Sequence, residues 1–391
     1  MISVTEAKNI LQNSVQPSPI HSLPLDQAIG YVLAENIHSP IAVPLFDNSA
    51  MDGYALALSE GVDQWTVKYI IQAGESRLPD LHKGEAARIF TGAPVPAGAD
   101  TVVQQEVIER TGDRISFDQS KFEIGANIRR SGSQNKKGDL LVTAGSLITP
   151  GTIGLLASVG IAEVNVYKDP SVAIIITGNE IKDVGSVLEL GQIYNSNGPV
   201  LKAYLSLLGI KNIEIYKAAD ERQALQEVID LSLSKHDVVL LSGGISVGDY
   251  DFVKEGLAKA GVQELFYKIK QRPGKPLFAG IKDRKLIFAL PGNPASVMTC
   301  FNQYVKPSIR QMMGHLKPWL PTAQLPIAHD FPKKEGLTFF MKAITEDGKV
   351  KTLTGQESFN QLSFGVSNCF VELPENNDII TAGTVVNVYE W

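Results

Sequence analysis

Two short apolar runs, each closed by a glycine-rich break, most constrain the fold of this 391-residue chain. The runs Asp237–Leu241 and Lys285–Leu290 are followed by Gly243, Gly244 and the segment Pro291–Pro294. Their length and their content of Val, Ile, Leu and Phe predict strands buried on both faces, as in a parallel sheet. Because ligands of open α/β sheets bind outside the carboxyl ends of the strands, the two breaks mark a predicted ligand edge.

Residues 171–317 repeat a pattern of strand, loop and helix. Val172–Ile176 and Ile213–Ala218 are two further predicted strands. A predicted helix begins near Pro199 and another near Asp220, each with apolar residues at helical spacing. Alternation of this kind predicts a doubly wound α/β domain with mainly parallel strands.

The flanking regions have a different texture. Residues 1–43 predict one helix capped by Thr5 and a second over 25–33, and residues 139–170 predict a helix at Pro150 and a strand at Glu163–Tyr167. Residues 44–138 and 318–391 show short alternating runs separated by turn signals, which predict β domains. The turns at 111–113 and 346–348 predict hairpins, and Thr384–Tyr389 predicts a final strand.

Composition excludes several classes of function. A formal net charge of −6 argues against a general nucleic-acid binder, which usually presents a basic surface. Cys300 and Cys369 are the only cysteines, so neither a disulfide framework nor a cysteine-based zinc site is expected. The start lacks the pattern of a signal peptide, and no apolar run approaches the length of a membrane span. A cytoplasmic protein without membrane partners is expected.

Acidic side chains follow several of the predicted strands. Glu180, Asp220 and the pair Asp249 and Asp251 each come after a different strand of one sheet. Taken alone, Asp220 with Gln223 resembles a helix capping box, and the other acids are acceptable turn residues. Together they would repel one another unless a cation joined them, so their convergence predicts a hard metal ion such as Mg²⁺. Which of Asp249 and Asp251 contacts the metal stays open.

Cations and a serine lie between and after these acids. Lys268, Arg272 and Lys275 fall close together, and Arg272 and Lys275 flank a Pro-Gly turn that exposes backbone amides. Such a segment suits a phosphate or a tetrahedral oxyanion. Ser296 stands near a predicted helix start, where it can cap the helix or donate to an anion. Because no nucleotide-binding fingerprint or nucleophile elbow is present, nicotinamide chemistry and nucleophilic catalysis are not expected.

Seven motifs in register resemble those of the molybdopterin molybdenumtransferases, a family that includes the E domain of gephyrin. The matching stretches span almost the whole chain and are Phe46–Tyr54, Thr91–Pro96, Thr177–Glu180, Tyr194–Pro199, Ser242–Asp251, Pro273–Pro276 and Leu290–Ser296. Members of this family insert molybdate into adenylylated molybdopterin with release of AMP. The resemblance therefore implies an enzyme of molybdenum cofactor biosynthesis.

The resemblance also implies an architecture of four domains. It places an elongated helical domain at 1–43 and 139–168, an inserted β domain at 44–138, a molybdopterin-binding doubly wound α/β domain at 169–317 and a C-terminal β-barrel domain at 318–391. It further implies a homodimer in which Asp52 and Thr91 enter the active site of the partner subunit. The molybdopterin adenylyltransferase and acceptor molybdoenzymes are the implied partners.

Carried over by motif position, the family's functional residues fall into three groups. The implied catalytic residues are Asp52, Thr91, Glu180, Asp220, Asp251, Lys268 and Arg272. The implied substrate and molybdate residues are Lys275, Pro276, Ser296, Lys342, Ser363, Asn195, Ser196, Asn197, Ser242, Gly243 and Gly244. The implied Mg²⁺ ligands are Glu180, Asp220, Asp249 and Asp251.

Three positions depart from the family pattern. Asn179 stands where the family often has Asp, and Ser133-Gln134 replaces Glu-Asp. Lys342 stands where the family usually has Arg, so it keeps the charge but loses the bidentate fork. Two other interpretations remain open beside insertion of molybdate: adenylyl transfer to molybdopterin, which would consume ATP, and a non-catalytic cofactor carrier or scaffold.

Overall fold

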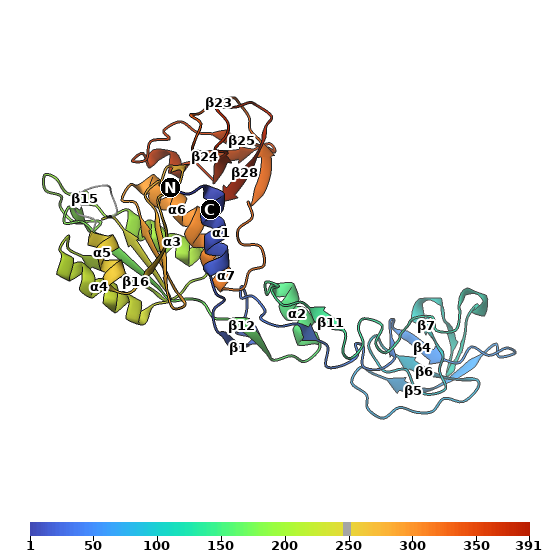
Figure 1. Ribbon diagram of the computed structural model, residues 1–391. Helices are drawn as coiled ribbons and strands as arrows, with labels where there is room; N and C mark the ends of the chain where they lie inside the picture. The colour runs from blue at the N-terminus through green and yellow to red at the C-terminus, as the bar shows by residue number, and fades with distance from the viewer. Residues whose placement is uncertain (245–251) are drawn as a thin grey trace. The chain divides into compact units, whose positions relative to one another are not determined.

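The computed structural model describes residues 1–244 and 252–391, which form two compact units (Figure 1). Unit 1 contains Met1–Ala34, Gly145–Ile148 and Val164–Trp391, and unit 2 contains Glu35–Ala144 and Thr149–Glu163. The chain thus mixes helices with extensive sheet in more than one body, as predicted. The division into four domains is finer than these two units and stays a prediction. Within the described residues, no helix is long and apolar enough to cross a bilayer.

A six-stranded sheet forms the centre of unit 1, in the order β16-β13-β17-β21-β20-β18. Its parallel strands are β13 (Val172–Thr177), β16 (Ile213–Ala218), β17 (Val238–Ser242) and β21 (Lys285–Leu290), which confirms the predicted parallel sheet. β20 (Phe278–Lys282) and β18 (Gln263–Tyr267) extend it antiparallel. These two antiparallel strands were not predicted.

Alternation along the strands divides the core between the two faces of this sheet. Val172, Ile174 and Ile176 of β13 lie in one apolar cluster, whereas Ala173 and Ile175 lie in the other. The first cluster is covered by α1 (Val4–Ser14), α3 (Asn197–Leu207), α6 (Pro294–Cys300) and α7 (Lys306–Met312). The second is covered by α4 (Arg222–Lys235) and α5 (Phe252–Lys259). Helices on both faces are the predicted doubly wound arrangement.

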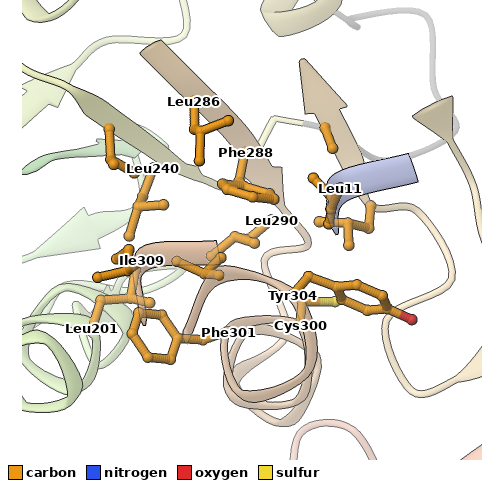
Figure 2. Close-up of a cluster of buried hydrophobic side chains, with 14 of the residues drawn as sticks. Leu11, Leu201, Leu240, Leu286, Phe288, Leu290, Cys300, Phe301, Tyr304 and Ile309 are labelled. Carbon is orange, nitrogen blue, oxygen red and sulfur yellow. The ribbon is translucent and has the colours of Figure 1, made fainter. Parts of the chain in front are cut away.

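The first cluster joins segments from both ends of the chain. Figure 2 shows Leu11 of α1 near Phe288 and Leu290 of β21, with Tyr304 and Ile309 from the segments after α6. Lys8, also on α1, donates from Nζ to Tyr389 Oη at 3.0 Å, across 381 positions of sequence. The helix begins one residue earlier than Thr5, and Ser3 is its N-cap because Ser3 Oγ accepts from the Glu6 amide. The prediction of Thr5 as cap was wrong.

A second sheet of unit 1 is built mainly from the C-terminal residues, in the order β19-β24-β26-β28-β22, with β25 paired to β24. Its strands are β19 (Gln271–Arg272), β22 (Ala323–Pro326), β24 (Thr338–Glu346), β25 (Lys349–Thr352), β26 (Cys369–Leu373) and β28 (Val385–Glu390). The hairpin at 346–348 and the final strand are confirmed. Because β19 precedes β20, this sheet begins inside the α/β region.

Unit 2 contains a six-stranded sheet in the order β7-β4-β6-β5-β9-β8. The strands are β4 (Gly53–Leu56), β5 (Trp65–Ile71), β6 (Glu85–Ile89), β7 (Thr101–Gln104), β8 (Glu109–Thr111) and β9 (Arg114–Ser116). β8 and β9 pair antiparallel through Gly112-Asp113, which confirms the predicted hairpin. Trp65, the first residue of β5, is fully buried.

The segments that lead between the units are mostly extended. β1 (Ile20–Pro24) pairs with β12 (Glu163–Tyr167), and β2 (Ile37–His38) pairs with β11 (Leu140–Val142). The helix predicted at Pro150 is α2 (Pro150–Ser158). The helix predicted over 25–33 was wrong, because only Leu25–Gln27 forms a 3₁₀ turn and Gly30 has a φ of 83°. Beyond that turn Val32 and Leu33 form bridges to other strands.

Candidate functional site

A cleft of about 520 Å³ lies at the carboxyl ends of the parallel strands. β13, β17 and β21 all end at this edge, as the parallel register requires. Among the predicted site residues, those that line the cleft are Glu180, Asn195, Ser196, Asn197, Ser242 and Gly243. The predicted ligand edge of the sheet is therefore hollowed, and residues from separate motifs meet there.

Glycine is required where β17 runs into the cleft. Gly243 and Gly244 have φ values of 98° and 68°, which L side chains rarely adopt. A Cβ at Gly243 would lie 2.8 Å from Thr177 Oγ1 and 2.9 Å from the Thr177 carbonyl oxygen. The absence of a side chain therefore lets the ends of β13 and β17 approach each other.

Asn197, at the start of α3, joins the ends of two strands, β17 and β21, at the cleft. Its Nδ2 donates to Ser242 Oγ at 2.9 Å and to the Gly292 carbonyl at 2.8 Å. Its Oδ1 is buried and finds no partner within the described residues. Asn195 has a local role, because its Oδ1 accepts from the Gly198 amide in the first turn of α3.

The acids of the site are only partly described. Asp220 and Asn179 exchange hydrogen bonds through their side chains and backbone amides, each at 3.4 Å. Asp220 does not cap α4, since Glu221 occupies the N-cap position, and the capping interpretation was wrong. Asp249 and Asp251 lie outside the described residues. Within residues 1–244 and 252–391, no three His, Cys, Asp or Glu side chains converge to hold a metal ion.

The three predicted cations form no ion pairs within the described part of the chain, which leaves their charges available for an anion. Lys268 Nζ lies 4.8 Å from the Tyr267 ring centroid, and the Arg272 guanidinium lies 5.6 Å from the Phe339 ring centroid. Lys275 is exposed to solvent. None of the three lines the cleft described above.

The turn that carries Arg272 and Lys275 packs against α6, from Ser296 to Cys300 at its end. A Cβ added at Gly274 would lie 2.6 Å from Cys300 Sγ and 3.5 Å from the Ser296 carbonyl oxygen. The structure therefore brings the basic turn, which includes Pro276, beside buried Ser296. Gly274, inside this turn, and Ser296 are therefore neighbours in the fold.

Gln271 holds the basic turn, and sequence reasoning missed it. This side chain is buried, and its Nε2 donates to the carbonyls of Pro273 and Gly274, both at 3.1 Å. Its Oε1 accepts from the Tyr304 hydroxyl. A lone glutamine beside a cation-rich turn gives little signal in a sequence.

Lys342 and Ser363 meet at a single backbone carbonyl. Lys342 Nζ donates to Gly355 O at 2.6 Å, and Ser363 Oγ donates to the same oxygen at 2.9 Å. Both side chains are buried. Phe359 and Gln361, on the loop between them, line the cleft, and Gln361 Nε2 donates to Ser196 Oγ at 3.3 Å. Neither loop residue was predicted from the sequence.

Asp52 and Thr91 form one constellation in unit 2. Asp52 Oδ1 accepts from the Thr91 amide at 2.8 Å and from the Thr91 hydroxyl at 3.0 Å. These two bonds, the amide first, lower the pKa of Asp52 below its usual value. The ionised form of Asp52 is therefore stabilised, and its other oxygen has no hydrogen-bond partner within the described residues.

Replacing Thr91 with valine should raise the pKa of Asp52, because the hydroxyl donor is lost while the amide donor remains. In the native protein the depressed pKa stabilises the fold above the unfolded-state pKa, and this contribution is lost as the pH falls through the folded-state pKa. We expect the Asp52 titration, followed by NMR, to move to higher pH in Thr91→Val and to keep its position in Thr91→Ser. An unchanged titration in Thr91→Val would show that the hydroxyl does not stabilise the carboxylate.

The remaining departure from the family pattern lies in a turn of unit 2. The Ser133 amide donates to the Arg130 carbonyl at 3.0 Å, and the Gln134 amide donates to the Val43 carbonyl at 2.9 Å. Arg130 pairs with Asp47 at 2.7 Å. Ser133 and Gln134 therefore shape a turn through their backbone groups.

Comparisons with known proteins cover the whole chain. The MoeA N-terminal region (domain I and II) matches residues 2–160, a probable molybdopterin binding domain matches residues 173–311, and the MoeA C-terminal region (domain IV) matches residues 324–391. The crystal structure of a molybdopterin biosynthesis MoeA protein from Pyrococcus horikosii is similar, with a TM-score of 0.86 and 30% identity over 100% of this chain and 99% of that one.

Curated relatives also match nearly the whole chain. A molybdopterin molybdenumtransferase of Staphylococcus aureus (strain Mu50 / ATCC 700699) is 35% identical over 99% of this chain and 95% of its own. One from Haemophilus influenzae (strain ATCC 51907 / DSM 11121 / KW20 / Rd) is also 35% identical, over 99% of this chain and 98% of its own. The resemblance inferred from the seven motifs is confirmed, and the chain belongs to the molybdopterin molybdenumtransferase family.

Proposed function

We propose that this protein is the enzyme that inserts molybdate into adenylylated molybdopterin and releases AMP, in molybdenum cofactor biosynthesis. The observation that carries the proposal is the cleft at the carboxyl edge of the sheet, together with the basic turn beside Ser296, whose cations form no ion pairs within the described residues. In the net reaction, the two dithiolene sulfurs bond to molybdenum while oxide leaves as water. Water also cleaves the phosphoanhydride, so that AMP leaves with the added oxygen.

The residues of this chain would contribute binding, orientation and charge stabilisation. Asn197, Ser242 and the Gly243 turn would hold the pterin and phosphate part of the substrate in the cleft. Lys275, Pro276 and Ser296 would bind molybdate, and Lys268 and Arg272 would hold phosphate oxygens. Direct contact of Ser363 with molybdate stays a prediction, and the role of Lys342 is taken up in the next subsection.

Glu180 and Asp220 fit a role as Mg²⁺ ligands. Carboxylate oxygens are the donors that Mg²⁺ prefers, and this ion is commonly held by one or two carboxylates together with substrate phosphates and waters. A cluster of three protein acids is therefore not needed for such a site. When bound, Mg²⁺ would neutralise charge on the phosphoanhydride, while Asp249 and Asp251 stay predicted ligands.

The proposed enzyme works as a cytoplasmic homodimer. Asp52 and Thr91 of one subunit would complete the site of the other, as the family resemblance implies. The proposed partners are the molybdopterin adenylyltransferase that supplies the substrate and the molybdoenzymes that accept the product. The C-terminal strands of unit 1 would form the family's β barrel.

The deciding experiment measures AMP release from adenylylated molybdopterin by the purified protein with Mg²⁺, with and without molybdate. We expect molybdate-dependent release and a product that activates an apo-molybdoenzyme. Lys275→Ala should lower the rate by about a hundredfold, because it removes a charge that stabilises the oxyanion. Lys202→Ala, which removes an exposed lysine of α3, is the matched control and should keep the wild-type rate.

Two outcomes would contradict insertion of molybdate. Tight binding of the precursor without any AMP release would favour a cofactor carrier. Consumption of ATP with unadenylylated molybdopterin would favour the adenylyltransferase. Equal rates of AMP release in Lys275→Ala and Lys202→Ala would show that the basic turn is not part of the active site.

A further inference from the structure

Lys342 lies inside the protein, where its ammonium binds backbone carbonyls of one loop. Its side chain belongs to β24 and is 2% exposed. Nζ donates to Gly355 O at 2.6 Å and to Asn360 O at 2.9 Å, and it lies 4.8 Å from the Phe364 ring centroid. Two of its three N–H donors are therefore satisfied by the protein itself. Burial lowers the pKa of Lys342, which agrees with an ammonium withdrawn from water.

The loop that Lys342 binds is residues 353–361, between β25 and a 3₁₀ helix at Leu362–Gly365, and is here termed the cleft loop. Gln356 joins it to β24 a second time, because its Oε1 accepts from the Lys342 amide at 3.0 Å and its Nε2 donates to the Lys342 carbonyl at 2.8 Å. Gly355 has a φ of 71°, and a Cβ there would lie 2.8 Å from Asn360 Nδ2. The two ends of the segment 355–360 are therefore drawn together tightly around the ammonium.

The opposite side of the cleft loop contacts the α/β sheet edge. The Ser358 carbonyl accepts from the Ala295 amide at 3.1 Å, and Ser358 Oγ accepts from Asn293 Nδ2 at the same distance. Phe359 and Gln361 line the cleft beside Asn197 and Gly243. The cleft loop thus forms one wall of the cleft, and Lys342 contacts this loop on the side away from the cleft. Ala295, whose amide donates to the loop, directly precedes Ser296.

We infer that Lys342 is a positioning residue, whose ammonium fixes the cleft loop as a wall of the substrate cleft, rather than a direct ligand of molybdate. The inference rests on the proposed function for the identity of the substrate, but the geometry of the loop does not depend on it. The lysine that replaces the family's usual arginine here acts as a point charge shared between two carbonyls. Its removal would leave both carbonyls unpaired and free the loop to open.

Limited digestion with chymotrypsin tests the loop directly. Phe359 is exposed, so its peptide bond becomes a substrate when the loop opens, and the new fragment beginning at Asn360 is identified by mass spectrometry. We expect cleavage at this bond to be about tenfold faster in Lys342→Met, because an equilibrium loss of one to two net hydrogen bonds raises the open population by that order. Lys351→Met, which removes an exposed lysine of β25, should be cleaved at the wild-type rate.

Gly355→Ala separates positioning from anion binding. It strains the closed loop while leaving the ammonium in place, so it should reproduce the faster cleavage of Lys342→Met. In AMP release, both variants should raise the half-saturating concentration of adenylylated molybdopterin about tenfold, with that of molybdate unchanged. This variant also keeps the test decisive if Lys342→Met fails to fold.

Two results would overturn the inference. One is wild-type cleavage in both Lys342→Met and Gly355→Ala. The other is a selective rise in the molybdate requirement of Lys342→Met, which would make the lysine an anion ligand. If the wild-type protein released no AMP at all, the proposed function would fail, while the cleavage rates would still decide the role of Lys342.

Discussion

Replacing Gln271 with leucine should destabilise the protein by about 3 kcal/mol, because buried polar groups that lose their partners each cost about 1–3 kcal/mol. The Pro273 and Gly274 carbonyls would lose the Nε2 donor, and the Tyr304 hydroxyl would lose its acceptor. Burial raises the pKa of Tyr304, so its hydroxyl stays protonated and still needs an acceptor. The urea-unfolding midpoint measures this loss.

The same change should slow AMP release by about a hundredfold, the order expected when a binding group is displaced by about 1 Å. Gln271 holds the turn between Arg272 and Lys275 in place through two donated hydrogen bonds, which leucine cannot form. Tyr304→Phe is the matched control, since it removes only the bond to Oε1. It should lower the unfolding midpoint less and leave the rate of AMP release near that of the wild type. Wild-type stability in Gln271→Leu would show that these bonds contribute nothing net.

Two inactive variants should restore activity to each other when they share a dimer. If Asp52 serves the partner's site, a heterodimer of Asp52→Ala with Lys275→Ala has one intact site and one site carrying both changes. Random mixing of subunits then gives about a quarter of the wild-type AMP release, because half of the dimers are mixed and each has one working site. Co-expression with two affinity tags isolates the heterodimer, which should show about half the wild-type rate by the same symmetry.

A second pairing controls for this experiment. Asp52→Ala mixed with Thr91→Ala places both changes in the same constellation of unit 2, so no site in a heterodimer regains both residues. We expect no gain over the separate variants. If Asp52→Ala with Lys275→Ala also showed no gain, each site would belong to a single subunit.

The parallel strands of the central sheet were the most predictable part of the fold. Continuous runs such as Ile213–Ala218 and Lys285–Leu290 matched β16 and β21 at both ends, since each run is bounded by turn residues. β18 was missed because edge strands carry mixed polar and apolar residues, and β20, inside the sheet, was missed because Gly280 interrupts a short run. The segment 25–33 was wrongly predicted to be a helix. Its Val32 and Leu33 are buried by partners far along the chain, and helical spacing alone cannot reveal such partners.

The site could be predicted only as far as motifs reach. Asn197, Ser242 and Gly243 were expected from their motifs and do meet at the cleft. Gln271 belongs to no recognisable motif, because its role depends on carbonyls that converge only after folding. For Lys342 the position was recognised, but the partners of its ammonium depend on the path of the cleft loop. For Asp220 the sequence pattern was misleading, because the spacing of a capping box is present but Glu221 occupies the N-cap position of α4.

Unit 2 is inserted into the sequence of unit 1, and this order affects how the chain folds during synthesis on the ribosome. All of unit 2 lies between Glu35 and Glu163, so it is complete in the nascent chain before most of unit 1 has been translated. α1 is made first, yet its apolar face packs against α7, and Lys8 pairs with Tyr389. The apolar face of the first helix therefore gains its native partners only when translation is nearly finished.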